Sequence, residues 1–203
     1  MAIHYTKILS GLQTPMRLFA GIALSYETRR NIELILQHLR PTAKLRWSPV
    51  ENLHITTKFI GEWPEERLGE LTAALGEVAR PDAIEISIAG LGWFPNPHAP
   101  RVFWAGVQAA PGLAELARGT EQRLVRLDIA AETREFSPHL TLARVPREGA
   151  GKAALSRLQQ AVAALPSADF GRFQAEKFHL YRSRQGPSGT VYEVVATFEL
   201  AVR

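Results

Sequence analysis

Short apolar runs alternate with longer amphipathic stretches along the chain, and the whole pattern occurs twice. One apolar run opens at Arg17-Leu18-Phe19, and a similar run opens about 85 residues later at Arg101-Val102-Phe103. Short apolar runs bounded by turn residues predict buried strands. Apolar positions at helical spacing follow each run and predict one helix per half. These positions are Ile32, Ile35, Leu36 and Leu39, and then Leu113, Leu116, Thr120, Leu124 and Leu127.

Each half continues with an alternating segment and a second helix. The alternating segments are Leu53-His54-Ile55-Thr56 and Pro138-His139-Leu140-Thr141, again about 85 residues apart. We expect the helix of the first half to begin near Pro64, because proline and the carboxylates that follow it suit a helix start. The apolar stripes of these helices are Leu68, Leu71, Leu75 and Val78, and Leu155, Leu158, Val162 and Leu165.

Further strands close each half. The isoleucines of residues 84–88 alternate with polar residues, which predicts a half-buried strand. Alternation around Phe178 and Phe198 flanks the turn at residues 185–189 and predicts a hairpin. Pro-rich residues 95–100 separate the halves. We therefore expect one α+β domain over residues 1–203, built as a pseudo-twofold duplication. Its parts would be an N-terminal extension at 1–15, a first lobe at about 17–94 and a second lobe at about 101–203.

The composition excludes several classes of protein. The chain has no cysteine, so it forms no disulfide and holds no thiolate metal site or iron–sulfur cluster. No apolar run approaches the roughly 18 residues of a membrane span, and the N-terminus has no secretory signal pattern. We therefore expect a cytoplasmic protein without a membrane partner. The formal net charge of +4 favours anionic partners only mildly.

The repeated His-x-Thr motif is the most informative feature of the sequence. Strand alternation places His139 and Thr141 on one face of their strand. In the first half, strict alternation places His54, Thr56 and Lys58 on one face and Leu53, Ile55 and Phe59 on the other. A third match, His4-Tyr5-Thr6, has no counterpart in the other half, and we interpret it as coincidence.

Two histidines at equivalent points of a duplication suit acid–base chemistry on a phosphodiester. Imidazole titrates near pH 6.5, so one ring can accept a proton while the other donates one. The hydroxyls of Thr56 and Thr141 can donate hydrogen bonds to phosphate oxygens. Two alternatives stay open at this point. The histidines could be structural, with neighbouring carbonyls as partners, or they could bind a metal, although no further ligands complete a metal-binding set at suitable spacing.

Several segments resemble the two-histidine (2H) phosphoesterases, and within them the RNA 2′,3′-cyclic phosphodiesterases, formerly called 2′-5′ RNA ligases. The segments are Met16–Ile22, Glu51–Gly61 and Ser137–Arg144, with further similarity at 90–95 and 180–183. The resemblance implies two antiparallel sheets facing a central cleft, with helices outside. It also implies hydrolysis of an RNA 2′,3′-cyclic phosphate to a 2′-phosphomonoester without a metal or cofactor.

The same resemblance implies a role for each motif residue. His54 resembles the proton donor to the departing 3′ oxygen and His139 the base that activates water, whereas the residues alone leave these two roles interchangeable. Thr56, Thr141 and Arg144 resemble phosphate-binding residues. Strict alternation would place Arg144 on the apolar side of its strand, so a phosphate contact requires the chain to turn there.

The expected partner is RNA with a 2′,3′-cyclic phosphate end, or a small cyclic nucleotide, bound by a monomer. Arg182 and Arg184 are further candidates for RNA contacts, with a solvated position as the simpler interpretation. Two other functions compete with hydrolysis. The same site could join RNA through a 2′-5′ linkage, or the chain could bind RNA without turnover, in which case we would expect the two histidines to be missing.

Overall fold

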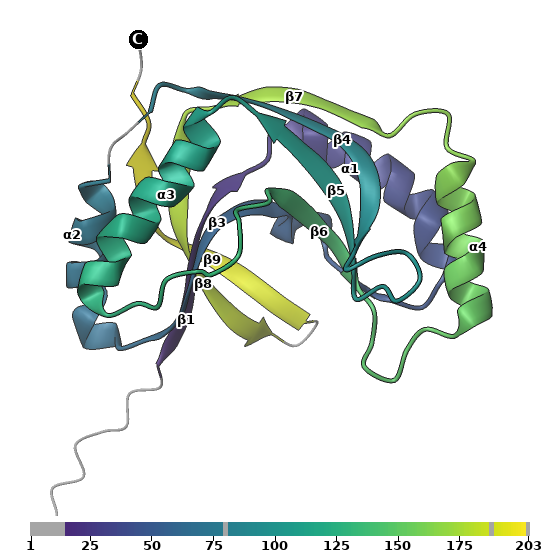
Figure 1. The fold of residues 1–203 in the computed structure, drawn as a ribbon, viewed down its shortest axis with the longest axis horizontal. Helices are drawn as coiled ribbons and strands as arrows, with labels where there is room; N and C mark the ends of the chain where they lie inside the picture. Colours follow the sequence, from purple (N-terminus) through teal and green to yellow (C-terminus); the bar gives the residue numbers. More distant parts are fainter. Residues whose placement is uncertain (1–14, 79–80, 187–188, 202–203) are drawn as a thin grey trace, which may run out of the picture.

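The computed structural model describes residues 15–78, 81–186 and 189–201, and in this part of the chain it contains four α-helices and two antiparallel sheets (Figure 1). The third His-x-Thr match lies outside the described residues. The helices are α1 (Tyr26–Leu39), α2 (Leu68–Gly76), α3 (Gly112–Leu124) and α4 (Lys152–Ala163). All four helices expected from the apolar stripes are present.

The first sheet has the strand order β3-β1-β8-β9, and the second has the order β2-β6-β5-β4-β7. The strands of the first sheet are β1 (Met16–Ala23), β3 (His54–Trp63), β8 (Lys177–Gly186) and β9 (Gly189–Glu199). Those of the second are β2 (Arg46–Trp47), β4 (Ile84–Phe94), β5 (Val102–Ala109), β6 (His139–Arg144) and β7 (Asp169–Ala175). Strands β8 and β9 form the expected hairpin. The α+β class and the two antiparallel sheets are thereby confirmed.

The helix boundaries follow local chemistry. The hydroxyl of Ser25 accepts a hydrogen bond from the backbone N–H of Thr28 at 3.1 Å and caps α1, as serine does at many helix starts. Short 3₁₀ helices connect other elements at Arg40–Thr42, Val50–Asn52, Glu65–Arg67 and Val125–Leu127. The expected start at Pro64 is therefore a 3₁₀ turn, and the α-helix itself begins at Leu68.

The two halves of the chain are interleaved in space. Strand β4 of the first half joins the sheet of β5 and β6, and β8 of the second half joins the sheet of β1 and β3. The helices are also mixed, because α1 contacts α4 and β7 while α2 contacts α3 and β9 (Figure 1). A twofold relation matches the order β3-β1-β8-β9 to β6-β5-β4-β7. The division near residues 95–100 thus describes the chain order, whereas each sheet takes strands from both halves.

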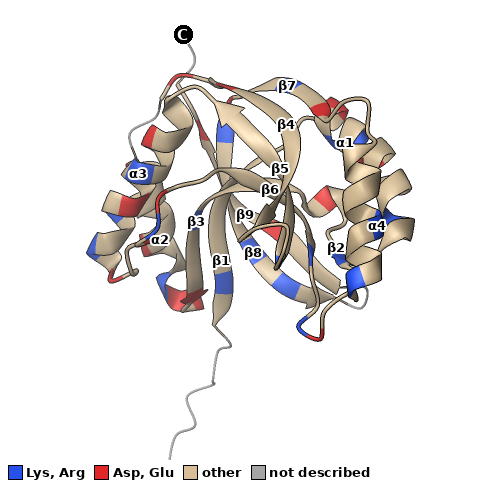
Figure 2. Ribbon diagram, turned by 45° about the vertical axis from the view of Figure 1, so that its right-hand side comes forward, with Lys and Arg blue, Asp and Glu red and all other residues tan. Residues whose placement is uncertain are grey.

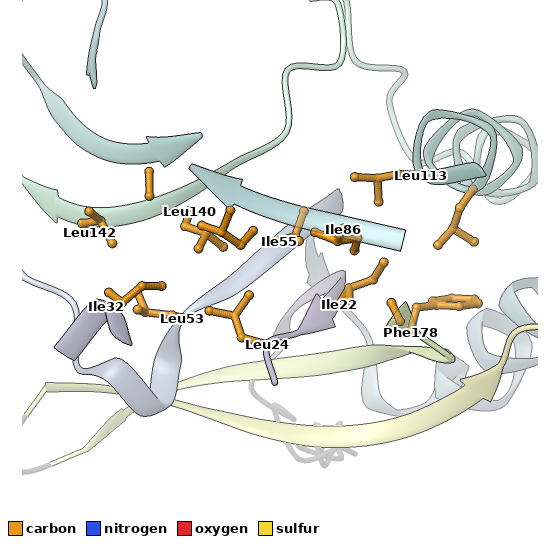
Figure 3. Close-up of a cluster of buried hydrophobic side chains, with 14 of the residues drawn as sticks. Ile22, Leu24, Ile32, Leu53, Ile55, Ile86, Leu113, Leu140, Leu142 and Phe178 are labelled. Atoms are coloured by element: carbon orange, nitrogen blue, oxygen red, sulfur yellow. The ribbon is translucent and has the colours of Figure 1, made fainter. Parts of the chain in front are cut away.

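One hydrophobic core connects both sheets to the helices. Buried side chains from β1, β3, β4, β6 and β8 lie together with side chains of α1 and α3 (Figure 3). Phe103, Phe170 and Phe178 are among the largest fully buried side chains. Each Å² of apolar surface buried in this core stabilises the fold by roughly 25 cal/mol, and this burial holds the strands in position. Within the described residues, no helix has the length and apolar character needed to cross a membrane.

Candidate active site

Strand pairing shows which residues share the face of each motif histidine. In the first sheet His54 lies opposite Ala23 of β1, and Thr56 lies opposite Gly21. Directly opposed residues of antiparallel strands point to the same side of a sheet. In the second sheet His139 lies opposite Gly106 of β5. We call the face that carries His54 and Thr56, or His139 and Thr141, the motif face of its sheet.

Each motif strand contains a β-bulge directly after its His-x-Thr. Thr57 has no partner between the pairs made by Thr56 and Lys58, and Leu142 has none between those of Thr141 and Ala143. One extra residue reverses the alternation of the following side chains. The bulge therefore brings Phe59 and Arg144 to the motif faces.

The bulge in β3 overturns two expectations from strict alternation. Phe59, expected on the apolar face, is 64% exposed and lies 6.4 Å from the ring of Phe19 on the motif face. Lys58, expected beside His54, is buried on the opposite face. Its Nζ lies 2.9 Å from Oε1 of Glu121 on α3 and donates to the carbonyl oxygen of Ala130 at 2.7 Å. Lys58 is therefore a buried ion-pair residue that faces α3.

The bulge in β6 resolves the difficulty with Arg144. Leu142 and Ala143 are both buried, and Arg144 then lies opposite Val102 of β5. Val102 and Trp104 are two residues apart, so their side chains lie on the same side of β5. Trp104 pairs with Thr141, and this side is therefore the motif face. Arg144 is exposed and shares the motif face of His139 and Thr141 without any turn of the chain.

The two motif histidines have the same hydrogen-bond arrangement. Nδ1 of His54 lies 2.7 Å from the carbonyl oxygen of Asn52, and Nδ1 of His139 lies 2.9 Å from that of Ser137. A carbonyl oxygen only accepts, so each Nδ1 carries the hydrogen and donates it. This tautomer leaves Nε2 of each ring as the atom that exchanges protons. Each carbonyl belongs to the residue two positions before the histidine.

Aromatic side chains surround His54. Its ring stacks on Phe19 with 4.4 Å between centroids, and the edge of Tyr192 approaches at 5.0 Å. Tyr181 in turn stacks on Phe19, with 5.0 Å between the two ring centroids. Burial lowers the pKa of His54, and the charges of Arg144 and His139 lower it further, while the hydrogen bond to Asn52 opposes the shift. In the free protein this environment favours neutral His54.

His54 and His139 come from different sheets, yet their strands β3 and β6 contact each other. The effect of His139 and Arg144 on the pKa of His54 shows that these groups lie within electrostatic range of its ring. On the second sheet the ring of Phe94 meets His139 edge-on at 5.0 Å. The structure therefore brings together both histidines and Arg144, with Thr56 and Thr141 on the same motif faces.

The segment between β2 and β3 connects the two motif strands. Ser48 donates from its N–H to the carbonyl oxygen of Leu142 at 2.8 Å and from its hydroxyl to that of Thr141 at 2.8 Å. Four residues later, the side-chain amide of Asn52 donates to the carbonyl oxygen of Thr190 on β9 at 2.6 Å. The segment is thus fixed to β6 at one end and to β9 at the other, directly before His54.

Arg182 and Arg184 lie away from the motif face. Arg182 is paired with Leu18 and so lies on the opposite side of β8 from Tyr181, which is paired with Phe19. Arg184 forms an ion pair with Glu193 of β9. Figure 2 shows basic residues in blue along β8 (Lys177–Gly186). Neither arginine takes part in the cluster around His54.

The model of the LigT-like phosphoesterase family matches residues 22–104 and 106–192 of this chain. The chain belongs to this family. The sheets and motifs described above are consistent with membership, because each matched segment contains one His-x-Thr strand. Among the described residues, no three His, Asp or Glu side chains are grouped so that they could hold a metal ion.

Two curated relatives of this LigT-like phosphoesterase carry the same name. A protein of Archaeoglobus fulgidus named RNA 2′,3′-cyclic phosphodiesterase is 34% identical over 184 residues, which are 91% of this chain and 100% of that protein. A protein of Thermus thermophilus with the same name is 34% identical over 193 residues, covering 91% of this chain and 90% of its own length.

Solved structures of the family share the fold. The protein TT0787 of Thermus thermophilus has a TM-score of 0.72 and 33% identity, covering 91% of this chain and 98% of that one. E. coli LigT complexed with 3′-AMP has a TM-score of 0.74 and 26% identity, and the match covers 92% of this chain and 99% of that one.

Sequence patterns alone did not single out the aromatic neighbours of His54 or the residues that fix the motif strands. Phe19 was expected only as part of an apolar strand, and Tyr192 gave no signal of its own. Asn52 and Ser137 contribute backbone carbonyls, which any residue could supply. Their only signal is their position, since both stand two residues before a motif histidine.

Proposed function

We propose that this chain hydrolyses the 2′,3′-cyclic phosphate at RNA ends to a 2′-phosphomonoester, with His54 and His139 as acid and base and without a metal ion. The observation that carries the proposal is the matched pair of imidazoles, each with Nδ1 held by a carbonyl and Nε2 left for proton exchange. The names of the relatives support the substrate class. Because each half of the chain supplies one histidine, the whole domain is one catalytic unit.

The chemistry balances with one water molecule. His139 accepts a proton from water at Nε2 as the water oxygen bonds to phosphorus. The bond between phosphorus and the 3′ oxygen breaks, and Nε2 of His54 donates a proton to that oxygen. The products are a 2′-phosphomonoester and a 3′ hydroxyl, and solvent returns the proton from His139 to His54. Thr56, Thr141 and Arg144 hold the non-bridging oxygens during this step.

His54 must be protonated when it acts as the acid, although the free protein favours its neutral form. Binding of the substrate favours the protonated form of His54. An anionic phosphate offsets the charge of Arg144 and places a negative group beside the ring, and both effects raise the pKa of His54. Substrate and proton therefore bind together. The lowered pKa equally suits the reverse assignment, with His54 as the base.

The proposal is tested with a short oligonucleotide that ends in 2′,3′-cyclic phosphate. Light scattering at the assay concentration checks separately whether the protein is the expected monomer. We expect a 2′-phosphate product at an equal rate in EDTA and in added Mg²⁺ or Mn²⁺. Loss of activity in EDTA would contradict metal-independent catalysis. A 3′-phosphate product would contradict the assigned cleavage, and a joined strand would indicate 2′-5′ ligation. Binding without any turnover between pH 5 and pH 8 would leave only an RNA-binding role.

A further inference from the structure

Two arginines lie directly opposite each other next to the motif residues of β6. Arg46 of the two-residue strand β2 pairs with Arg144 of β6, so both side chains lie on the motif face of the second sheet. Both residues are exposed, and β2 forms the edge of the sheet beside β6 (Figure 2). No carboxylate of the described residues forms an ion pair with either guanidinium.

The fold holds these like charges together. Like charges directly opposite each other destabilise a sheet. Arg46 is nevertheless fixed by the next two residues. The ring of Trp47 packs edge-on against Phe103 at 6.0 Å, and its Nε1 donates to the carbonyl oxygen of Ala43 at 3.2 Å. Ser48 makes the two hydrogen bonds to β6 described above. An anion on this face would remove the repulsion.

We propose that Arg46 binds a second phosphate of the RNA, the phosphodiester on the 5′ side of the terminal nucleotide. This inference rests on the proposed function. Arg144 shares the motif face of β6 with His139 and Thr141, so we assign it to the reacting phosphate. Arg46 lies one strand further out, at a spacing of about 4.8 Å and on the edge strand of the sheet, within reach of an RNA chain that continues past the reacting phosphate over this edge.

A second phosphate site makes the enzyme distinguish an RNA end from a free nucleotide. A nucleoside 2′,3′-cyclic monophosphate has only the reacting phosphate, whereas a dinucleotide or longer RNA with the same end has the 5′ phosphodiester as well. Arg46 therefore contributes to binding of the oligonucleotide alone. Its guanidinium can donate two hydrogen bonds to one phosphate, which a lysine ammonium does less specifically.

The test compares kcat/KM for two substrates, a nucleoside 2′,3′-cyclic monophosphate and a trinucleotide ending in 2′,3′-cyclic phosphate. We expect Arg46→Gln to lower the value for the trinucleotide about tenfold and to leave that for the monophosphate within about twofold of wild type. Arg46→Lys should recover part of the loss. Arg144→Gln should lower both values. Arg30→Gln, which changes an exposed arginine of α1, should change neither.

A binding measurement gives an independent readout. The probe is a fluorescent trinucleotide ending in a 2′-phosphate, titrated by anisotropy at several salt concentrations. Arg46→Gln should reduce the slope of log K against log salt by about 0.7, as expected for one lost phosphate contact with a single strand. An equal loss of kcat/KM for both substrates would show that Arg46 and Arg144 share one phosphate, and this would overturn the proposal. So would an unchanged trinucleotide reaction together with an unchanged salt slope. A wild-type protein that hydrolyses neither substrate contradicts the proposed function instead, and the salt slope then still tests Arg46.

Discussion

Phe59 and Arg144 occupy equivalent positions of the duplicated fold, five residues after His54 and His139 respectively, and both reach the motif face through a β-bulge. Their side chains differ completely. The first half presents an exposed aromatic ring and the second a cation. The duplication thus supplies matched proton-transfer groups, while the bulged positions make the site asymmetric. The charge of Arg144 lowers the pKa of His54 across the two sheets, and this electrostatic effect has a measurable consequence.

Replacing Arg144 with Gln should raise the pKa of His54, because the positive charge that disfavours the imidazolium is removed. NMR titration of the His54 ring in the free protein measures this shift directly. The pH profile of kcat/KM reports the acid and base of the free enzyme, so it should contain the same titration. We expect the limb that corresponds to His54 to move to higher pH in the variant. A profile that does not move while the NMR titration does would remove His54 from the acid–base pair.

Removal of either motif histidine should reduce turnover without unfolding the protein. We expect His54→Ala and His139→Ala each to lower kcat by about 10²–10⁴-fold, the usual contribution of one general acid or base. His38→Ala, which changes an exposed histidine of α1, is the matched control and should retain full activity. Circular dichroism and urea melts check the fold. A loss for His4→Ala comparable to that for His139→Ala would show that the third His-x-Thr motif is functional.

The motif threonines should contribute through their hydroxyls. Within the described residues, neither Thr56 nor Thr141 has a side-chain hydrogen bond, so both hydroxyls are available to a phosphate. Hydrogen bonds to charged groups contribute about 1.5–3 kcal/mol, so Thr56→Val and Thr141→Val should each lower kcat/KM by about 10- to 100-fold. Unchanged kinetics would remove the threonines from the site.

Thr57→Val is the matched control for this series. Thr57 is the bulge residue next to Thr56, and its hydroxyl is buried without a partner within the described residues. Valine keeps the shape of the side chain and removes the unsatisfied hydroxyl. We expect normal kinetics and an increase of about 1 kcal/mol in the free energy of unfolding, measured by urea denaturation.

The elements of the fold were accessible from the sequence, because helical and strand periodicities directly reflect burial. Their arrangement in two antiparallel sheets was implied only by the family resemblance, and the bulges were not predicted at all. A bulge adds one residue without a distinctive composition, and Thr57 and Leu142 look like ordinary members of an alternating strand. The positions after the bulge were therefore assigned to the wrong face in the first half, where Lys58 and Phe59 exchange places. The histidines stand before the bulge, so their faces could be predicted correctly.

The apparent repeat of the two apolar runs does not show which aromatic residues are equivalent in the fold. Arg17-Leu18-Phe19 and Arg101-Val102-Phe103 look equivalent, which would give Phe19 and Phe103 the same environment. Strand pairing instead matches Phe19, opposite Phe59, to Val102, opposite Arg144. Phe19 therefore stacks on His54, whereas Phe103 is in the core. A shift of one residue moves a strand side chain to the other face, so an apparent repeat cannot fix which face it occupies.

The buried pair between Lys58 and Glu121 should contribute to stability and leave catalysis unchanged. Lys58 has a side-chain exposure of 5%, whereas Glu121 is 26% exposed and also accepts from the backbone N–H of Glu132 at 2.8 Å. Glu121→Gln leaves the ammonium buried without its counter-ion and should lower the free energy of unfolding by about 3 kcal/mol. Lys58→Met should cost less, because the carboxylate that remains is partly solvated and keeps a donor.

A double-mutant cycle separates the pair from its parts. Because apolar or neutral replacements of both partners avoid an isolated buried charge, the variant with Lys58→Met and Glu121→Gln should be more stable than Glu121→Gln alone. Urea melts at neutral pH give the four free energies of unfolding. Steady-state kinetics on a nucleoside 2′,3′-cyclic monophosphate should be unchanged in the folded variants, since Lys58 faces α3 on the opposite side of β3 from His54. A fall in kcat for Lys58→Met with normal stability would instead place its charge in the catalytic machinery and contradict the face assigned by the bulge.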